Sequence, residues 1–500
     1  MDQYYQDNML MGMKIYNFLH RYAVNGKISG NLACISEIKN AAVVLYSPRG
    51  CGFHYRYHAR SRNTPVYGLE CADLRNQDVI FGGEQKLVDL LYKIEREQKP
   101  ELIFVLPSVV SDIVNDDMTG VVLSLQPQFK AKLVPVTSQA FSHMDKSNSR
   151  KVLREKSCQQ QNKKFSSSAV YPGCGYVEVM DALVQQVMEP QRVEPLAVNL
   201  ETFAWGFNGA MKLQGMVQTL ARMGISVNTC LPAADLTGIR RAPRAALNIV
   251  RRKKWALAMQ EKFGTPFIHV ADMQEWHGIA GIGDLYRQIG TMLHCEERVE
   301  QVLQASWQQI RPRYDALRQS FTRHSFCLIA HGLAMLPDAI RVYQVDYGLP
   351  LKKICLVMNP SYQAEIGADD STMQRFRARI EQAKQEYGCE ADIVIDPAED
   401  ELRAAVQACD FVIDNGHPRY AGLGRPLLYN LFDRSVWTYE GFLEIMEEIN
   451  RTLQSGQCLG DKLLLRKLAY DPVFYPLRCE DTASRNSREM FSRLWRQREK

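Results

Sequence analysis

The amino-acid sequence predicts an α/β protein with three Rossmann-like domains, each a mostly parallel sheet flanked by helices. Three observations predict this class. Short apolar runs alternate with segments that carry apolar residues at helical spacing, which is typical of parallel sheets covered by helices. This alternation starts three times along the chain. A length of 500 residues, 46% of them hydrophobic, accommodates about three such domains.

The first series begins with two apolar runs, at residues 41–48 and 101–108, which we predict to be buried strands. Between them a helix is expected to begin near Gly83. Its buried face is marked by four apolar residues: Leu87, Leu90, Leu91 and Ile94. The first domain is placed at residues 1–190, and the polar, basic segment 144–168 is interpreted as a solvated insert within it.

The same alternation starts twice more. A predicted strand at Glu194 is followed by a helix that stops at Gly224 and by a further strand. A third series of strands and helices starts at Ser325. We therefore expect a second α/β domain over residues 191–322 and a third over residues 323–481.

Charge and hydropathy exclude several classes of protein. The net charge of +5 is too small to indicate a nucleic-acid partner. No apolar run reaches the roughly 18 residues that a membrane span needs, and the first residues lack the layout of a signal peptide. The sequence therefore predicts a cytoplasmic protein with no membrane partner. The basic tail 482–500 is expected to form a surface helix or, alternatively, an arm that binds a partner.

Cysteine spacing also narrows the chemistry. The 13 cysteines are spread along the chain without a CxxC pair. In a cytoplasmic protein this argues against a disulfide framework and against a compact zinc or ferredoxin-type site. Most of the thiols are expected in the core, because free cysteine packs as a small hydrophobe.

Cys51 is the exception because of its position. It lies between two glycines, directly after the predicted strand 41–48, on the sheet edge where ligands bind in parallel α/β domains. At the start of a helix its thiol would feel the positive end of the helix dipole, which favours the thiolate that binds metals. A packed core cysteine is the alternative. His54 and His58 share a helical face with Cys51, so a Cys/His metal site is a further alternative.

Two other segments carry polar chemistry. Cys71 precedes Asp73 and Asp78, and as a single thiol it fits a structural role or a ligand role. The segment 239–255 gathers basic residues around an apolar stretch, which we interpret as a solvated helix face or, alternatively, an anion site. The glycines of 278–285 form only a weak dinucleotide motif, and there is no P-loop, so the chain is not expected to hydrolyse ATP itself.

Three motifs taken together resemble a known family. SPRGCGFHYR (47–56), ECADLRNQDVIFGGEQKL (70–87) and ELIFVLPSVVSDIVNDD (101–117) occur in the order and spacing of the nitrogenase component 1 family. That family includes the two chains of the molybdenum–iron protein, their cofactor-assembly scaffold and the dark-operative protochlorophyllide reductase. The resemblance covers roughly residues 20–450 and is closer to the β-type chains.

The resemblance implies an architecture and partners. It implies three α/β domains and pairing with a homologous component 1-type subunit in a heterotetramer. It also implies an iron–sulfur cluster of [4Fe-4S] type, shared between the two subunits and fed with low-potential electrons by an ATP-hydrolysing iron-protein reductase. Cluster thiolates that converge from separate loops agree with the absence of a CxxC pair.

Carried over residue by residue, the resemblance gives an incomplete ligand set. Cys51 matches the central cluster ligand. The preceding ligand is expected near Asn25, where there is no cysteine, and Cys34 is the nearest thiol. The third ligand position is Val109. Cys71 matches a position that is often cysteine in the family without being a ligand. The candidate metal ligands are Cys51, Cys34 and Cys71.

The resemblance leads to three hypotheses for function. The first is an oxidoreductase subunit of a nitrogenase-like, iron–sulfur-dependent reductase that is active only with a partner chain. The second is a β-like scaffold chain for assembly of a nitrogenase-type metal cofactor. The third is a metal-free relic of the fold. Residues 248–255 (NIVRRKKW) stand where α-type chains hold the catalytic metal cofactor through a cysteine, so this chain is not expected to carry that cofactor.

Overall fold

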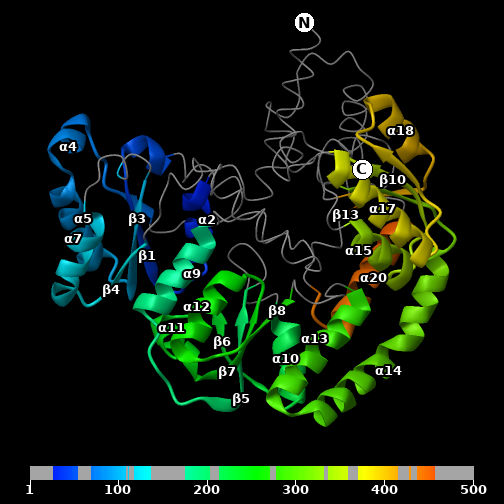
Figure 1. Ribbon diagram of the computed structural model, residues 1–500, viewed down its shortest axis with the longest axis horizontal. Helices are drawn as coiled ribbons and strands as arrows, with labels where there is room; N and C mark the ends of the chain where they lie inside the picture. Colours follow the sequence, from blue (N-terminus) through cyan, green and yellow to red (C-terminus); the bar gives the residue numbers. More distant parts are fainter. Residues whose placement is uncertain are drawn as a thin grey trace, which may run out of the picture. The chain divides into compact units, whose positions relative to one another are not determined.

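Figure 1 shows the computed structural model of the chain. The structure describes residues 26–53, 69–108, 111, 117–136, 175–202, 213–270, 278–330, 336–357, 370–414, 427–429 and 436–455. The predicted insert 144–168, the tail 482–500 and the candidate residues His54, His58 and Val109 lie outside these ranges.

The first sheet has four parallel strands in the order β2-β1-β3-β4. The strands are β1 (Ala41–Tyr46), β2 (Leu69–Cys71), β3 (Leu102–Pro107) and β4 (Lys132–Pro135). The helices around it are α2 (Gly26–Ile35), α4 (Asn76–Phe81), α5 (Glu84–Glu97), α7 (Met118–Leu125), the 3-10 turn η1 (Gln126–Gln128) and α9 (Gly175–Gln186). The predicted strands at 41–48 and 101–108 are confirmed as β1 and β3. Their side chains are almost all buried because apolar cores cover both faces of the sheet.

The start of helix α5 is fixed by a close approach of the backbone. Gly83 is the residue before the helix, as predicted. A Cβ atom at Gly83 would lie 2.5 Å from Cδ2 of Leu74 and 2.6 Å from the hydroxyl of Tyr46. Only glycine therefore allows α5 to begin this close to the end of β1.

The second sheet has four parallel strands in the order β6-β5-β7-β8. The strands are β5 (Glu194–Glu201), β6 (Ser226–Leu231), β7 (Ala245–Val250) and β8 (Phe267–His269). The helices are α10 (Gln214–Arg222), α11 (Leu236–Arg240), the 3-10 turn η5 (Ala242–Arg244) and α12 (Lys253–Phe263). The interpretation of 239–255 as one helix face is wrong, since its apolar stretch forms the central strand β7 and its basic residues lie in the flanking turns and helices.

The third sheet has five parallel strands in the order β11-β10-β9-β12-β13. The strands are β9 (Phe326–Ala330), β10 (Leu351–Leu356), β11 (Asp392–Ile395), β12 (Phe411–Asp414) and β13 (Leu427–Tyr429). The remaining helices are α13 (Gly278–Leu293), α14 (Glu296–Phe321), α15 (Leu336–Ile340), the π-helix η7 (Arg341–Asp346), α17 (Asp370–Glu386), α18 (Glu399–Gln407) and α20 (Tyr439–Ser455). The glycines of 278–285 lie within α13, so they do not form a phosphate-binding loop after a strand.

The three helix-flanked parallel sheets confirm the predicted fold class. The first two sheets share a continuous core, in which Phe104 of β3 and Leu183 of α9 belong to one cluster with Val250 of β7 and Trp255 of α12. These two sheets form one compact unit and the third sheet belongs to another. The predicted domain boundaries stay a prediction. No helix among the described residues combines the length and apolar character needed to cross a bilayer.

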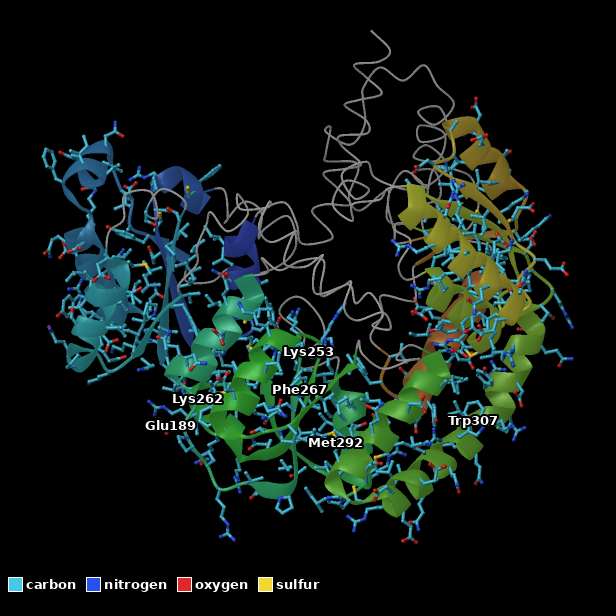
Figure 2. All side chains as sticks on the ribbon, in the orientation of Figure 1. Glu189, Lys253, Lys262, Phe267, Met292 and Trp307 are labelled. Carbon is cyan, nitrogen blue, oxygen red and sulfur yellow. The ribbon has the colours of Figure 1, made fainter. Side chains whose placement is uncertain are left out.

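A polar contact closes the seam between the first two sheets. The ammonium group of Lys262 on α12 donates to the carbonyl oxygens of Val184, at 2.9 Å, and Gln185, at 2.8 Å. Both acceptors lie in the last turn of α9, where unpaired carbonyls favour a cation. Figure 2 labels Lys262 together with Glu189, which follows this helix end. The seam is therefore held by apolar packing and by a capped helix terminus.

We expect Gly278→Ala to destabilise the start of α13 by about 3 kcal/mol, because it disrupts a buried ion pair. Gly278 has a φ of +78°, and a Cβ there would lie 1.8 Å from Oδ2 of Asp346. That same oxygen is 3.0 Å from Nη1 of Arg341 and accepts from the backbone N–H of Ile279. Hydrogen exchange of peptides spanning α13 and η7 measures the loss.

Gly388→Ala is the matched control. Its φ is +61° and no atom lies within 4 Å of the added Cβ. Only the backbone penalty of about 1 kcal/mol is expected there. Equal losses of protection in the two variants would contradict the role assigned to the Asp346 contact.

Candidate metal centre at the carboxyl edge of the first sheet

Parallel pairing of two strands brings two of the candidate thiols to one corner. Strand β2 pairs with β1 in a register that places Cys71 opposite Leu45. Ser47 follows β1 directly, and a helical turn from residue 49 to residue 53 carries Cys51. The two cysteines are 20 residues apart in sequence, but the ends of their strands are neighbours at the carboxyl edge of the sheet.

Ser47 is the centre of this corner. Its hydroxyl oxygen lies 3.3 Å from Sγ of Cys71 and also hydrogen-bonds to the thiol of Cys51. The Cys71 thiol points toward the carbonyl oxygens of Ser47, at 3.2 Å, and Pro48, at 3.5 Å. A Cβ on Gly52 would lie 2.9 Å from Cβ and 3.1 Å from Sγ of Cys71. The glycine after Cys51 therefore allows the turn to pack directly on the second thiol.

The electrostatics of the corner correct one expectation. The pKa of Cys51 is raised from its ordinary value, first by burial and then by the neighbouring Cys71, while the Ser47 hydrogen bond lowers it. The predicted preference for thiolate is therefore wrong for the metal-free chain, because burial outweighs the start of a short helical turn. Metal coordination deprotonates a thiol irrespective of this shift, so a ligand role stays compatible with the geometry.

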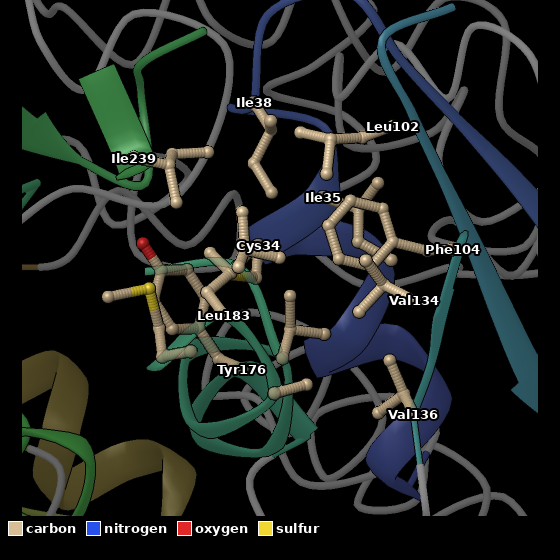
Figure 3. Packing of buried hydrophobic residues seen from close by; sticks show 14 of the residues in the cluster. Cys34, Ile35, Ile38, Leu102, Phe104, Val134, Val136, Tyr176, Leu183 and Ile239 are labelled. Carbon is tan, nitrogen blue, oxygen red and sulfur yellow. The ribbon is translucent and has the colours of Figure 1, made fainter. Parts of the chain in front are cut away.

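Cys34 lies in different surroundings. It is fully buried on α2, within the apolar core that also holds Ile35, Leu183 and the ring of Tyr176 (Figure 3). Cys51 and Cys71 are only partly buried at the sheet edge. These surroundings favour a core residue at Cys34, whereas the two edge thiols have the placement that a shared ligand site needs.

The two carboxylates near Cys71 in the sequence, Asp73 and Asp78, each form an ion pair with a basic side chain. Asp73 accepts a bidentate pair from Arg49, with Nε at 3.1 Å and Nη2 at 2.6 Å, and this contact is the main cause that lowers the pKa of Asp73. Asp78 is 2.5 Å from the ammonium of Lys86 and has a lowered pKa for the same kind of reason. In the part of the chain that the structure describes, no three His, Cys, Asp or Glu side chains are set around one metal position. The corner therefore offers two of the side chains that a metal site would need, but not a complete set of ligands.

Exposed apolar side chains lie on the Cys51 turn and on helix α4. Phe53 is the last residue of that turn and is 69% exposed. Helix α4 buries none of its residues, and its last two side chains, Ile80 and Phe81, are 72% and 85% exposed. Large exposed apolar side chains of this kind are typical of protein–protein contact surfaces.

Comparison with known proteins identifies the family. The family model described as nitrogenase component 1 type oxidoreductase matches residues 27–454. The chain belongs to this family. The match confirms the resemblance drawn from the 47–56, 70–87 and 101–117 motifs, and its extent agrees with the span predicted from them.

Two curated relatives of this nitrogenase component 1-type chain show the range of the family. The chain is 27% identical over 304 residues to the nitrogenase iron-molybdenum cofactor biosynthesis protein NifE of Clostridium pasteurianum, which covers 56% of this chain and 58% of the relative. It is 21% identical over 268 residues to a light-independent protochlorophyllide reductase subunit of Zygnema circumcarinatum, covering 52% and 48%. The chain thus spans about half the length of the curated relatives it matches.

A solved structure supports the fold. The nitrogenase component 1-type chain matches the structure titled nitrogenase Cp1 at pH 6.5 with a TM-score of 0.55 and 15% identity. The match covers 86% of this chain and 88% of that one. At this identity the likeness concerns the fold alone.

Two features of the corner are not apparent in the sequence. Nothing there distinguishes Ser47, although its hydroxyl contacts both thiols. Cys71 stands as a single thiol, because nothing in the local sequence shows that β2 lies beside β1. The signal that could have found both is the parallel pairing itself, which puts the residue after one strand beside the end of its neighbour.

Proposed function

We propose that this chain is one half of a two-chain scaffold on which a nitrogenase-type metal cofactor is assembled. The observation that carries the proposal is the convergence of Cys51 and Cys71 on Ser47 at the carboxyl edge of the first sheet. The NifE proteins among its relatives favour a scaffold over a reductase. The arginine- and lysine-containing segment at 248–255, in place of a cofactor cysteine, agrees with a chain that does not hold the catalytic cofactor permanently.

The donor set fits a share of an iron–sulfur cluster. A [4Fe-4S] cluster takes four cysteine thiolates, and the corner offers two. Val109 lacks a sulfur and no cysteine stands near Asn25. Among the described residues no third ligand side chain joins the two thiols, and a homologous partner chain would supply the remaining ligands. Cys51 and Cys71 would each supply one thiolate, and the Ser47 hydroxyl would donate its single proton to one of the two sulfurs. A bound cluster would supply electron storage at low potential, fed by an ATP-hydrolysing iron-protein reductase.

Exposed apolar side chains support a covering partner. Phe53 lies on the turn that carries Cys51, and Ile80 and Phe81 lie on α4 of the same domain. A second chain that covered these side chains would remove them from water and would bring its own thiolates to the corner. A shared cluster and a shared interface would then form in the same step.

A reductase is the second candidate function. The similarity to a subunit of light-independent protochlorophyllide reductase favours it. In that case the cluster would pass electrons to a substrate held elsewhere in the complex. Transfer of a preformed cofactor to a recipient protein, measured beside reductive turnover on the same anaerobic preparation, separates the two functions. An iron-free preparation with neither activity would support the metal-free relic instead.

Single cysteine variants test the ligand assignment. In the complex purified anaerobically with its homologous partner, Cys51→Ala and Cys71→Ala are each expected to weaken cluster retention at least about tenfold, because each removes a direct ligand. Iron and acid-labile sulfide per chain, with the electron paramagnetic resonance of the reduced cluster, measure the loss.

Cys34→Ala is the matched control for these variants. It makes the same chemical change in the apolar core, so bound iron is expected to stay at the wild-type level while stability falls slightly. A loss of bound iron in Cys34→Ala, with iron retained in Cys71→Ala, would contradict the assignment. Cys34 would then be a ligand and Cys71 would not.

A further inference from the structure

Three buried oxygen-bearing side chains meet between the first two sheets. Glu37 lies just after α2, Tyr176 near the start of α9 and Thr202 at the end of β5, and they are 7%, 0% and 0% exposed. The Tyr176 hydroxyl is 3.3 Å from Oε1 of Glu37 and 3.1 Å from Oγ1 of Thr202. The Thr202 hydroxyl also forms a short hydrogen bond with Oε2 of Glu37. The three groups form a closed ring.

The ring is complete in only one protonation state of the Glu37 carboxyl group. Three O–H···O contacts need three protons. The hydroxyls of Tyr176 and Thr202 supply one each. An ionised Glu37 supplies none, whereas a protonated Glu37 supplies the third and makes every contact a proper hydrogen bond. The geometry therefore fits a neutral Glu37.

The two charged groups that face the ring act on Glu37 in opposite directions, so burial decides its charge. The guanidinium of Arg252 stacks 3.7 Å above the ring of Tyr176, but its ion pair is with Glu201, which is fully buried. Burial is the largest cause and raises the pKa of Glu37 to about 8. The hydrogen bonds with Thr202 and Tyr176 and the charge of Arg252 lower that pKa, and Glu201 raises it. Cys34, on α2, is a further titratable group near the ring, and together with burial and Glu37 it raises the pKa of Tyr176.

We propose that Glu37, Tyr176 and Thr202 form a proton-sensitive latch between the first two domains, closed when Glu37 carries a proton and loosened when it does not. The latch joins α2 and α9, which flank the first sheet, to the carboxyl end of β5 in the second. It lies in the shared core against which Cys51 packs. Loss of one proton would leave a buried negative charge and an incomplete ring at this seam.

Linkage gives the direction and slope of the effect. The pKa of Glu37 in the folded chain, about 8, lies above its ordinary value of 4.5. The stabilisation by the protonated carboxyl is therefore complete below about pH 4.5 and is lost as the pH rises through about 8. Each opening that exposes Glu37 releases a proton in this window, so the opening constant rises about tenfold per pH unit.

Hydrogen exchange on the full chain tests the latch. We expect protection of peptides from α2, the start of α9 and the end of β5, corrected for the intrinsic exchange rate, to fall about tenfold per pH unit between about pH 6 and 7.5. Glu37→Gln, which keeps the shape and cannot ionise, is expected to show no such slope. Thr202→Val should keep the slope at lower protection, because Glu37 still titrates. Glu189→Gln, an exposed acid in the same compact unit, should behave as wild type.

Two results would overturn the proposal. One is a wild-type chain without a slope, and the other is a Glu37→Gln chain that keeps it. If Glu37→Gln does not fold, as judged by circular dichroism, infrared spectra of the wild-type chain decide the matter. A protonated-carboxyl band present at about pH 7 and gone by about pH 9 supports the latch, and the absence of that band at the lower pH rejects it.

Discussion

If Cys51 and Cys71 hold the proposed cluster, replacing Gly52 with alanine is expected to remove most of the bound iron. The added methyl group would lie 3.1 Å from Sγ and 2.9 Å from Cβ of Cys71, so the thiol has to move. Gly52 is not among the residues with positive φ, so backbone strain does not contribute. Ligand sites tolerate displacements of only about 0.5 Å, and retention of the cluster is expected to fall at least about tenfold.

Gly50→Ala provides a control two residues away. It is also outside the left-handed region, and no atom lies within 4 Å of its added Cβ. The iron content of this variant should match the wild type. Iron and sulfide analysis of the two variants in the partnered complex makes the comparison, and equal retention in both would show that the position of Cys71 does not matter for binding.

Glu201→Ala is expected to cost about 3–5 kcal/mol of stability, because it removes the carboxylate that forms an ion pair with a buried guanidinium. Glu201 is fully buried at the end of β5 and pairs with the side chain of Arg252. Its carboxylate also accepts from the backbone N–H groups of Arg251, at 2.9 Å, and Arg252, at 3.0 Å, and from Nε1 of Trp255, at 3.1 Å. One deletion therefore removes the partner of four donors.

The other end of the same strand offers the control. Glu194, at the start of β5, pairs with Arg244, and both side chains are more than 40% exposed. Exposed pairs contribute below about 1 kcal/mol, so Glu194→Ala should have little effect. Urea denaturation followed by circular dichroism compares the variants. Similar midpoints for Glu201→Ala and the wild type would contradict the structural role of the buried pair.

The fold was predictable where the apolar pattern is unambiguous. The strands at 41–48 and 101–108 are continuous apolar runs, and only a strand covered on both faces buries every side chain of such a run. The start of α5 at Gly83 was predictable from its glycine and the apolar spacing that follows. The segment 239–255 was misassigned because its basic ends resemble a solvated helix, whereas the six residues between them lie in the middle of a sheet.

The candidate site was only partly predictable. Cys51 could be placed because it directly follows a strand, and position at a strand end is a local property. Cys34 is a candidate because it is the cysteine nearest to Asn25 in the sequence. Nearness in sequence does not show that the side chain of Cys34 faces the core. The approach of Cys71 to Ser47 depends on which strands are neighbours, and strand order is a property of the whole sheet.

The free-standing helix α4 has a consequence for how the protein is made in the cell. Ile80 and Phe81 lie on a surface that no described segment of the chain buries. A newly synthesised chain would offer these side chains to chaperones and to other nascent chains. If the proposed partner chain covers them, synthesis of the two chains at matched rates would shorten that exposure.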